Sequence, residues 1–340
     1  MNKKSNTGKS TPLGEKIKSH ALYLGFDLVG FSQIKADKAA YAHYEKWLKK
    51  GNAADLTYMS EKERVEKRRT AKSLLKNAKT VISLAVNYYH AQPPLKRGHG
   101  RVAMYAFGRD YHKVIGKKLK ELEEFIRNFS SETLSYVDTG PILERTFAVQ
   151  AGLGFIGKNT TLITPEFGSF VFLAEIITDL EIEKSQANSV PGRRSTNQFK
   201  SFKNSALHCG SCTRCIDVCP TKALNKNFLN AKKCIAYNTI ENKAALSKIP
   251  KPIREAMKKS KYIFGCDICQ LACPHNCRAK ESDYSKSPKI AGDSLSLKKI
   301  ADLGSGKKAD EKFLKLFAGS PLMRAKLKGL KRNARILTNK

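Results

Sequence analysis

The chain has 340 residues, 41% of them hydrophobic, which is enough for one large domain or two ordinary domains with a proper core. Its formal net charge of +33 makes a polyanion, with nucleic acid first, the natural partner, although a generally basic proteome would produce the same excess. Its apolar stretches are all shorter than the roughly 18 residues of a membrane span, and no secretory segment opens it. We therefore expect a cytoplasmic protein that does not enter membranes.

The first half of the chain alternates predicted helices and strands. Residues 1–13 are a polar, lysine-bearing tail that we expect to be disordered. The alternation over 14–180 favours one α/β or α+β sheet domain. The pattern predicts helices over 14–25, 41–50, 61–72, 110–128 and 142–151, strands over 26–31, 81–87 and 135–138, and paired strands over 161–164 and 169–178.

An Asp and a His precede the helix predicted over 110–128. Asp110, His112 and Gly116 nearly match the D-x-H-x-x-G signature of enzymes that ligate cobalamin cobalt through His, but one residue is extra. The alternative, which we favour, is that Asp110 caps the helix and His112 lies in its first turn.

Asp138 lies at the end of a predicted strand and before the turn Thr139-Gly140-Pro141. A carboxyl group there can project into a cleft, stay protonated through partial burial and act as an acid. Arg145 could orient it or bind an anion. Alternatively, Asp138 caps the helix that begins near Ile142. The spacing leaves both interpretations open.

Glycines 152, 154 and 157 follow the helix predicted over 142–151 and fit G-x-G-x-x-G. A dinucleotide-binding loop should follow a strand, so that interpretation fails. Close approach of this backbone to a large cofactor remains reasonable.

Eight of the nine cysteines occur at close, defined spacings, and two runs among them end in a cysteine followed by proline. Eight cysteines at this spacing are the ligand count of two [4Fe–4S] clusters. Zinc sites and disulfides are the alternatives, but zinc has no need of the C-P ending and disulfides suit secreted proteins. The pattern comprises Cys209, Cys212, Cys215 and Cys219 before Pro220, a lone Cys234, and Cys266, Cys269 and Cys273 before Pro274.

The cysteine before proline crosses to the other cluster in bacterial two-cluster proteins. This rule predicts two ligand sets with the clusters close together, which suits electron transfer. Cys277 is left over and is expected to be a bystander. The first set is Cys209, Cys212, Cys215 and Cys273, and the second is Cys219, Cys234, Cys266 and Cys269.

The cysteines lie between two basic segments. Residues 181–204 read as a basic linker, 205–280 as a ferredoxin-like domain for two [4Fe–4S] clusters, and 281–340 as a basic helical C-terminal segment. Short helices are predicted over 297–301 and 311–317, followed by a basic helix over 323–340. That helix could lie on nucleic acid, on a membrane surface or in solvent.

Several motifs in order resemble the epoxyqueuosine reductase family, cobalamin-dependent enzymes that complete queuosine synthesis on tRNA. The resemblance covers about residues 14–335. The motifs are RVAMYAFGRDYHK (101–113), VDTGPILER (137–145), AGLGFIGKNT (151–160), GSFVFLAEI (168–176), CGSCTRCIDVCPTKAL (209–224), CIAYNTIE (234–241) and GCDICQLACPHN (265–276).

The resemblance implies an α+β protein. Its N-terminal α/β domain, over 14–180, would be related to that of reductive dehalogenases and bind cobalamin without a His ligand. A two-cluster ferredoxin-like domain and a short helical C-terminal tail would follow. The resemblance makes Asp138 the proton donor with Arg145 beside it. It places near the corrin Asp138, Lys158, Asn159, Thr160, Ser169 in the turn 168–170, Ala236, Tyr237 and Asp267. One departure is that the Arg expected soon after Met59 is missing, and Arg64 could substitute.

The implied substrate is tRNA with a GUN anticodon carrying epoxyqueuosine at the wobble position. The epoxide would become an alkene by uptake of two electrons and two protons and loss of water. An external low-potential donor would feed the second cluster, then the first, and reduce cob(II)alamin to cob(I)alamin, which attacks an epoxide carbon while Asp138 protonates the oxygen. A monomer is implied. The alternatives are a related corrinoid iron–sulfur reductase of a small molecule, a non-enzymatic ferredoxin-type electron carrier, and a structural nucleic-acid-binding protein.

Overall fold

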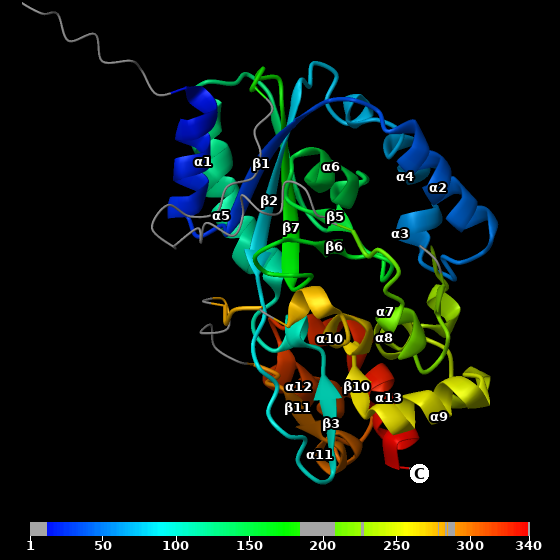
Figure 1. Ribbon diagram of the computed structural model, residues 1–340. Coiled ribbons are helices and arrows are strands. Elements are labelled where there is room, and N and C mark those ends of the chain that lie inside the picture. The colour runs from blue at the N-terminus through cyan, green and yellow to red at the C-terminus, as the bar shows by residue number, and fades with distance from the viewer. Residues whose placement is uncertain are drawn as a thin grey trace, which may run out of the picture.

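The computed structural model describes residues 12–183, 208–225, 228–277, 279–282, 284 and 290–338 (Figure 1). Nearly all of the predicted disordered tail and most of the predicted basic linker lie outside the described residues. Figure 1 shows a larger sheet with helices on both sides, and beyond one end of it a mostly helical part that carries the cysteine-bearing segments.

Four strands form the larger sheet, and every neighbouring pair is antiparallel. Their order is β1 (Leu28–Gln33), β2 (Thr80–Asn87), β7 (Val171–Thr178) and β4 (Thr133–Val137). All eight residues of β2 are buried, because this strand has a neighbour on each side and helices on both faces. The antiparallel sheet combined with helices confirms the predicted α+β class.

Alternate residues of β7 face opposite layers of helix. Phe172 packs in one hydrophobic cluster with residues of α1 (Leu13–Tyr23) and α5 (Tyr111–Arg127), which lie on one face of the sheet (Figure 1). Leu173 packs instead with residues of α6 (Glu144–Gln150), on the other face. This is the period of two expected of a strand buried on both sides.

The charged segment predicted as one helix over 61–72 is shorter than expected. Helix α4 covers only Lys62–Lys67, and a separate 3₁₀ turn covers Ala71–Ser73. The side chain of Thr70 accepts a hydrogen bond from the Lys72 N–H (3.4 Å), a local bond that competes with continuation of the helix. Two further helices precede it, α2 (Lys38–Lys49) and α3 (Thr57–Ser60).

The predicted pairing of residues 161–164 with 169–178 is wrong. Strand β6 (Leu162–Ile163) pairs with β5 (Phe155–Ile156), while β7 enters the larger sheet between β2 and β4. The glycine-rich turn makes this possible. A Cβ added to Gly154 would lie 2.1 Å from the carbonyl oxygen of Ile163, so only glycine allows the two short strands to approach this closely.

A second, three-stranded sheet was not predicted. Strand β3 (His99–Val102) pairs in parallel with β10 (Tyr262–Phe264) and antiparallel with β11 (Ser294–Ser296). A segment from the first third of the chain is therefore built into the cysteine-bearing part. Around it lie α9 (Lys251–Ser260), α11 (Leu297–Ala301), α12 (Lys307–Phe317) and α13 (Lys326–Thr338).

The C-terminal basic helix is packed into the fold along one face. One face of α13 is buried, including Leu330 and Ala334, each 0% exposed. Its Arg332 side chain is also buried and donates to the carbonyl oxygens of Asn238 (2.5 Å) and Ala244 (3.0 Å). Helix α13 therefore stabilises the C-terminal part of the fold through its buried face, and its other face is basic. In the described part of the chain, no helix has the length and apolar character needed to cross a membrane.

Short elements carry or adjoin the cysteines. Cys215 lies in α7 (Arg214–Asp217) and Cys269 in α10 (Ile268–Leu271), while Cys234 is the N-cap of α8 (Ile235–Ile240). Strands β8 (Leu224–Asn225) and β9 (Phe228–Leu229) lie between Cys219 and Cys234. Helices α7 and α10 lie against each other, and this contact brings the first cysteine run beside the second.

Candidate active site and cysteine pockets

Asp138 follows the last residue of β4 in a backbone conformation that L-residues rarely adopt. Its φ is 58°, and its side chain is 51% exposed. Oδ2 accepts a hydrogen bond from the Tyr111 hydroxyl (2.5 Å). The alternative that Asp138 caps the next helix is wrong, because α6 begins at Glu144 and its N-cap is Leu143. The strain, about 1–3 kcal/mol, is typical of residues held in place for function.

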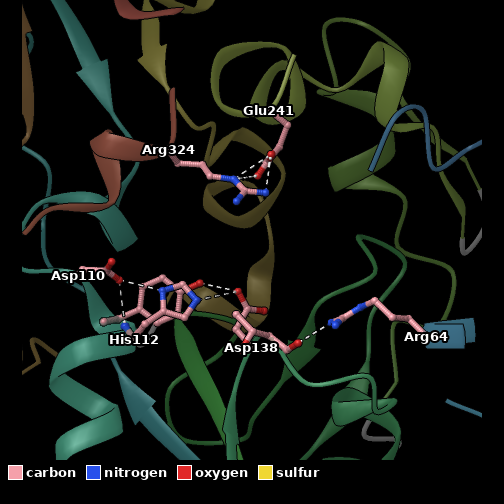
Figure 2. Close-up of polar contacts among 8 residues, drawn as sticks. Arg64, Asp110, His112, Asp138, Glu241 and Arg324 are labelled. Atoms are coloured by element: carbon pink, nitrogen blue, oxygen red, sulfur yellow. Dashed lines mark hydrogen bonds and ion pairs between the residues drawn. The ribbon is translucent and has the colours of Figure 1, made fainter. Parts of the chain in front are cut away.

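His112 lies between two carboxylates, as Figure 2 shows. Its Nδ1 is 2.8 Å from Oδ1 of Asp110, and its Nε2 is 3.8 Å from Oδ2 of Asp138. Asp110 also caps α5 by accepting from the His112 N–H (3.1 Å). This confirms the favoured prediction of a helix cap. The structure also places two further side chains in the candidate site: Tyr111, for which the sequence predicted no role, and His112, for which a cobalt-ligand role was the less favoured alternative.

Arg64 reaches the Asp138 loop from a neighbouring helix. Its Nη2 donates to the carbonyl oxygen of Thr139 (2.6 Å) (Figure 2). Its Nε donates to the carbonyl oxygen of Tyr58 (3.1 Å). The guanidinium therefore joins two backbone segments and holds the residue directly after Asp138. A contact of Arg64 with a corrin remains a prediction.

An ion pair from the C-terminal part faces Asp138 across the site in Figure 2. Arg324 binds Glu241 with Nη2–Oε2 and Nε–Oε1 distances of 2.9 Å each, and its guanidinium lies 5.8 Å from the centre of the Tyr58 ring. Burial, together with the charges of Glu241 and Asp138, raises the pKa of Tyr58 to about 12. Sequence reasoning missed all three residues. The one available signal was the position of Glu241 in a family motif.

Arg145 was expected beside Asp138, but its hydrogen bond is made elsewhere. Its Nη1 donates to the carbonyl oxygen of Thr160 (2.5 Å), which ties α6 to the turn between β5 and β6. The neighbouring Glu144 interacts electrostatically with Asp138. Burial and the charge of Asp138 raise the pKa of Glu144, while the charge of Arg145 lowers it, and the result is a pKa of about 8.

Several predicted corrin contacts lie where the two halves of the chain meet. Ser169 donates from its N–H to Oδ1 of Asn276 (2.7 Å) and from its hydroxyl to Oε1 of Gln270 (2.9 Å). Asp267 is buried and accepts from the Met104 N–H (2.9 Å), and burial raises its pKa to about 7.

Ala236 and Tyr237 lie in α8, and the Tyr237 hydroxyl hydrogen-bonds to Asp55. These contacts also join the two halves. Their direct contact with a corrin remains a prediction.

The first predicted cysteine set shares one pocket. Its lining contains Cys209, Cys212, Cys215 and Cys273, together with Lys158 and Asn159 from the N-terminal half. Cys273 comes from the second run, and it lines the same pocket as three cysteines of the first run. Within the described residues, no group of three or more His, Cys, Asp or Glu side chains is arranged to hold a single metal ion. Ligation of a cluster by these four cysteines remains a prediction.

The second predicted set is also close together. Burial raises the pKa of Cys269, and the charges of Cys234 and Cys219 are among those that raise it further. Burial likewise raises the pKa of Cys266, with Cys234 and Cys269 adding to it. Every cysteine, including the exposed Cys277, is a free thiol in the structure. Eight grouped thiols fit two iron–sulfur clusters.

Comparison with known proteins gives consistent matches along the chain. A family model described as epoxyqueuosine reductase QueG, DUF1730, matches residues 68–139, and one described as a 4Fe-4S double cluster binding domain matches residues 208–276. An epoxyqueuosine reductase from Gloeobacter violaceus is 39% identical over 333 residues, which is 95% of each chain.

Two solved structures extend the comparison. A crystal structure of an epoxyqueuosine reductase with an epoxyqueuosine-modified tRNA-Tyr stem loop matches with a TM-score of 0.78 and 30% identity, over 95% of this chain and 80% of that one. A Bacillus subtilis epoxyqueuosine reductase, solved with its catalytic aspartate loop swung out of the active site, matches with a TM-score of 0.76 and 28% identity, over the same shares. The chain belongs to the epoxyqueuosine reductase family.

Proposed function

We propose that this protein reduces epoxyqueuosine at the wobble position of tRNA to queuosine, with Asp138 as the proton donor. The observation that carries the proposal is the placement of Asp138. Its carboxyl group is half-exposed, held at Oδ2 by Tyr111 and flanked by His112. A related enzyme was crystallised with an epoxyqueuosine-modified stem loop, which supports the same substrate here.

The residues present fit the cofactors that the family uses. We assign one [4Fe–4S] cluster to Cys209, Cys212, Cys215 and Cys273, and the other to Cys219, Cys234, Cys266 and Cys269. Polar side chains from both halves face the space beside Asp138, where cobalamin would bind. Bound cobalamin, as cob(I)alamin, would supply the low-potential nucleophile that the reaction needs. An external low-potential donor would reduce the clusters again after each turnover.

The side chains around Asp138 are placed to donate and transfer protons. One carboxyl oxygen is occupied by the Tyr111 hydroxyl, so the other, Oδ1, is available to protonate the epoxide oxygen. The reaction takes up two protons, whereas Asp138 holds only one. His112, 3.8 Å from Oδ2, is placed to return a proton to Asp138 before the oxygen leaves as water.

The positive net charge of the chain suits a large, negatively charged tRNA substrate. A net charge of +33 attracts an anticodon stem loop, and the modified base of a single-stranded loop can be turned outward into a protein pocket. We propose tRNA with a GUN anticodon as the substrate and a monomer as the working form.

The deciding experiment measures queuosine directly. Anaerobically purified protein with reconstituted clusters and cobalamin is incubated with epoxyqueuosine-modified tRNA and a reductant, and the nucleosides are analysed by mass spectrometry. Wild-type protein should form queuosine. Asp138→Asn should retain the visible spectra of both cofactor types but form none. Normal product formation by this variant would rule out Asp138 as the acid.

A further inference from the structure

The pocket of the first cysteine set is completed by the other half of the chain. Lys158 and Asn159, in the turn between β5 and β6, line it beside Cys209, Cys212 and Cys273. The family resemblance implied a corrin contact for both residues. Their position in the structure points to a different ligand.

The amide group of Asn159 has one defined orientation. Its Oδ1 accepts from the Thr161 N–H (3.2 Å) and from the Thr161 hydroxyl (2.8 Å). Exchange of the amide oxygen and nitrogen would place an NH₂ group against the Thr161 N–H, where two donors would face each other. The Nδ2 group is therefore the part of the side chain that is left for another acceptor.

That Nδ2 group is buried without an acceptor. Asn159 is 4% exposed, and Nδ2 has no hydrogen-bond partner among the described residues. A buried donor without an acceptor costs about 1–3 kcal/mol. Asn159 lines the cysteine pocket, where the other side chains that can accept a hydrogen bond are the four cysteine sulfurs and the His275 ring. A cluster held by those sulfurs would bring further sulfur acceptors into the same pocket.

The neighbouring Lys158 already donates a hydrogen bond to a sulfur of the first cysteine set. Its backbone N–H donates to Sγ of Cys209 (3.3 Å). Its Nζ donates to the carbonyl oxygens of Gly210 (2.8 Å) and Cys212 (2.9 Å), which fixes the cysteine loop against this turn. Two consecutive residues of the N-terminal half thus direct N–H groups and a positive charge at the first cysteine set.

We propose that Asn159 donates a hydrogen bond from Nδ2 to a sulfur of the first [4Fe–4S] cluster and, with the Lys158 N–H, raises the reduction potential of that cluster. Hydrogen bonds to sulfur stabilise the reduced, more negative cluster, so they raise its potential. The effect favours electron flow from the second cluster to the first. This inference rests on the proposed assignment of the first cluster to these four cysteines.

The test is a redox titration of the full chain with reconstituted clusters, followed by electron paramagnetic resonance. Asn159→Leu removes the donor, and one of the two reduction steps should move to lower potential. A tenfold loss in the ratio of reduced to oxidised cluster corresponds to a shift of about 59 mV for one electron. Asn159→Asp keeps the side-chain shape, lacks the donor and adds an acceptor, so its shift should be in the same direction and larger.

A second asparagine provides the control. Asn230 has a buried side-chain atom without a partner, but that atom is the acceptor Oδ1, so Asn230→Leu should leave the first-cluster step unchanged. Unchanged potentials in both Asn159 variants, with two clusters present, would overturn the inference and leave the proposed function intact. Wild-type protein that holds only one cluster would instead overturn the cluster assignment.

Discussion

The Tyr111 hydroxyl donates a hydrogen bond to Oδ2 of Asp138 across 2.5 Å, and this bond joins the first turn of α5 to the end of β4. The two residues are 27 positions apart and belong to different layers of the fold. Asp138 is thus positioned by a helix that packs on one face of the sheet, and not only by its own strained loop.

Tyr111→Phe should slow the reaction without unfolding the protein. The ring still packs against Phe172, but the carboxyl group of Asp138 loses the hydroxyl donor at Oδ2 and can rotate away from the substrate. We expect a roughly tenfold fall in single-turnover queuosine formation, since a positioned acid contributes about 10²–10⁴-fold. Tyr23→Phe, at an 84% exposed tyrosine, is the matched control and should be neutral. Equal rates for both variants would contradict the positioning role.

Arg64→Met should loosen the Asp138 loop. The substitution removes the bonds to the carbonyl oxygens of Thr139 and Tyr58, so the strained Asp138 backbone can relax. A relative solved with its catalytic aspartate loop swung out is consistent with such a movement. Amide hydrogen exchange over 138–141 should become faster, and turnover should fall. Lys67→Met, which removes only a surface pair with Glu63, is the control and should leave exchange in this loop unchanged.

The residue types of the site could be predicted from the sequence better than the long-range contacts that position them. Cysteine spacing alone groups Cys273 with the first run, and the structure brings these residues to one pocket. The apolar runs over 81–87 and 169–178 and the helical spacing over 110–128 likewise located β2, β7 and α5.

Residues whose roles depend on long-range contacts could not be predicted in this way. Arg324 was read only as part of a basic helix, and its ion pair with Glu241 spans 83 positions of sequence. The three-residue strands β10 and β11 are too short to give a periodic signal, and they form because β3 lies between them. Arg332 was counted as a surface charge, although three backbone carbonyl groups hold it inside the fold.

Turnover on tRNA should fall steeply as salt is added. Each phosphate contact releases counterions and adds about 0.7–0.9 to the slope of log affinity against log salt. With a net charge of +33, we expect kcat/KM on a modified stem loop to fall at least about tenfold between about 50 and 200 mM KCl. Reduction of the clusters by dithionite, followed by absorbance over the same range, is the control for general salt effects. A flat kcat/KM profile would remove the electrostatic role proposed for the charge.

Glu175→Gln should make the stability of the protein less dependent on pH. Glu175 lies in β7 on the face toward α6, is 0% exposed, and neither carboxyl oxygen has a hydrogen-bond partner among the described residues. Burial raises its pKa well above the ordinary value, and the charges of Glu144 and Asp138 raise it further. The folded state therefore keeps a proton at pH values where the unfolded chain has lost it.

The sign of the effect follows from this difference in bound protons. The stabilisation is complete below the unfolded pKa of about 4.3 and is lost as the pH rises toward the raised folded pKa, at ~1.4 kcal/mol per pH unit. Urea unfolding of the reconstituted protein from about pH 5 to pH 8 should show a smaller decline in the free energy of unfolding for Glu175→Gln than for wild type. The exposed Glu124→Gln should follow wild type. If Glu175→Gln and wild type decline in parallel, Glu175 is ionised in the folded state and a cation or water network must stabilise it.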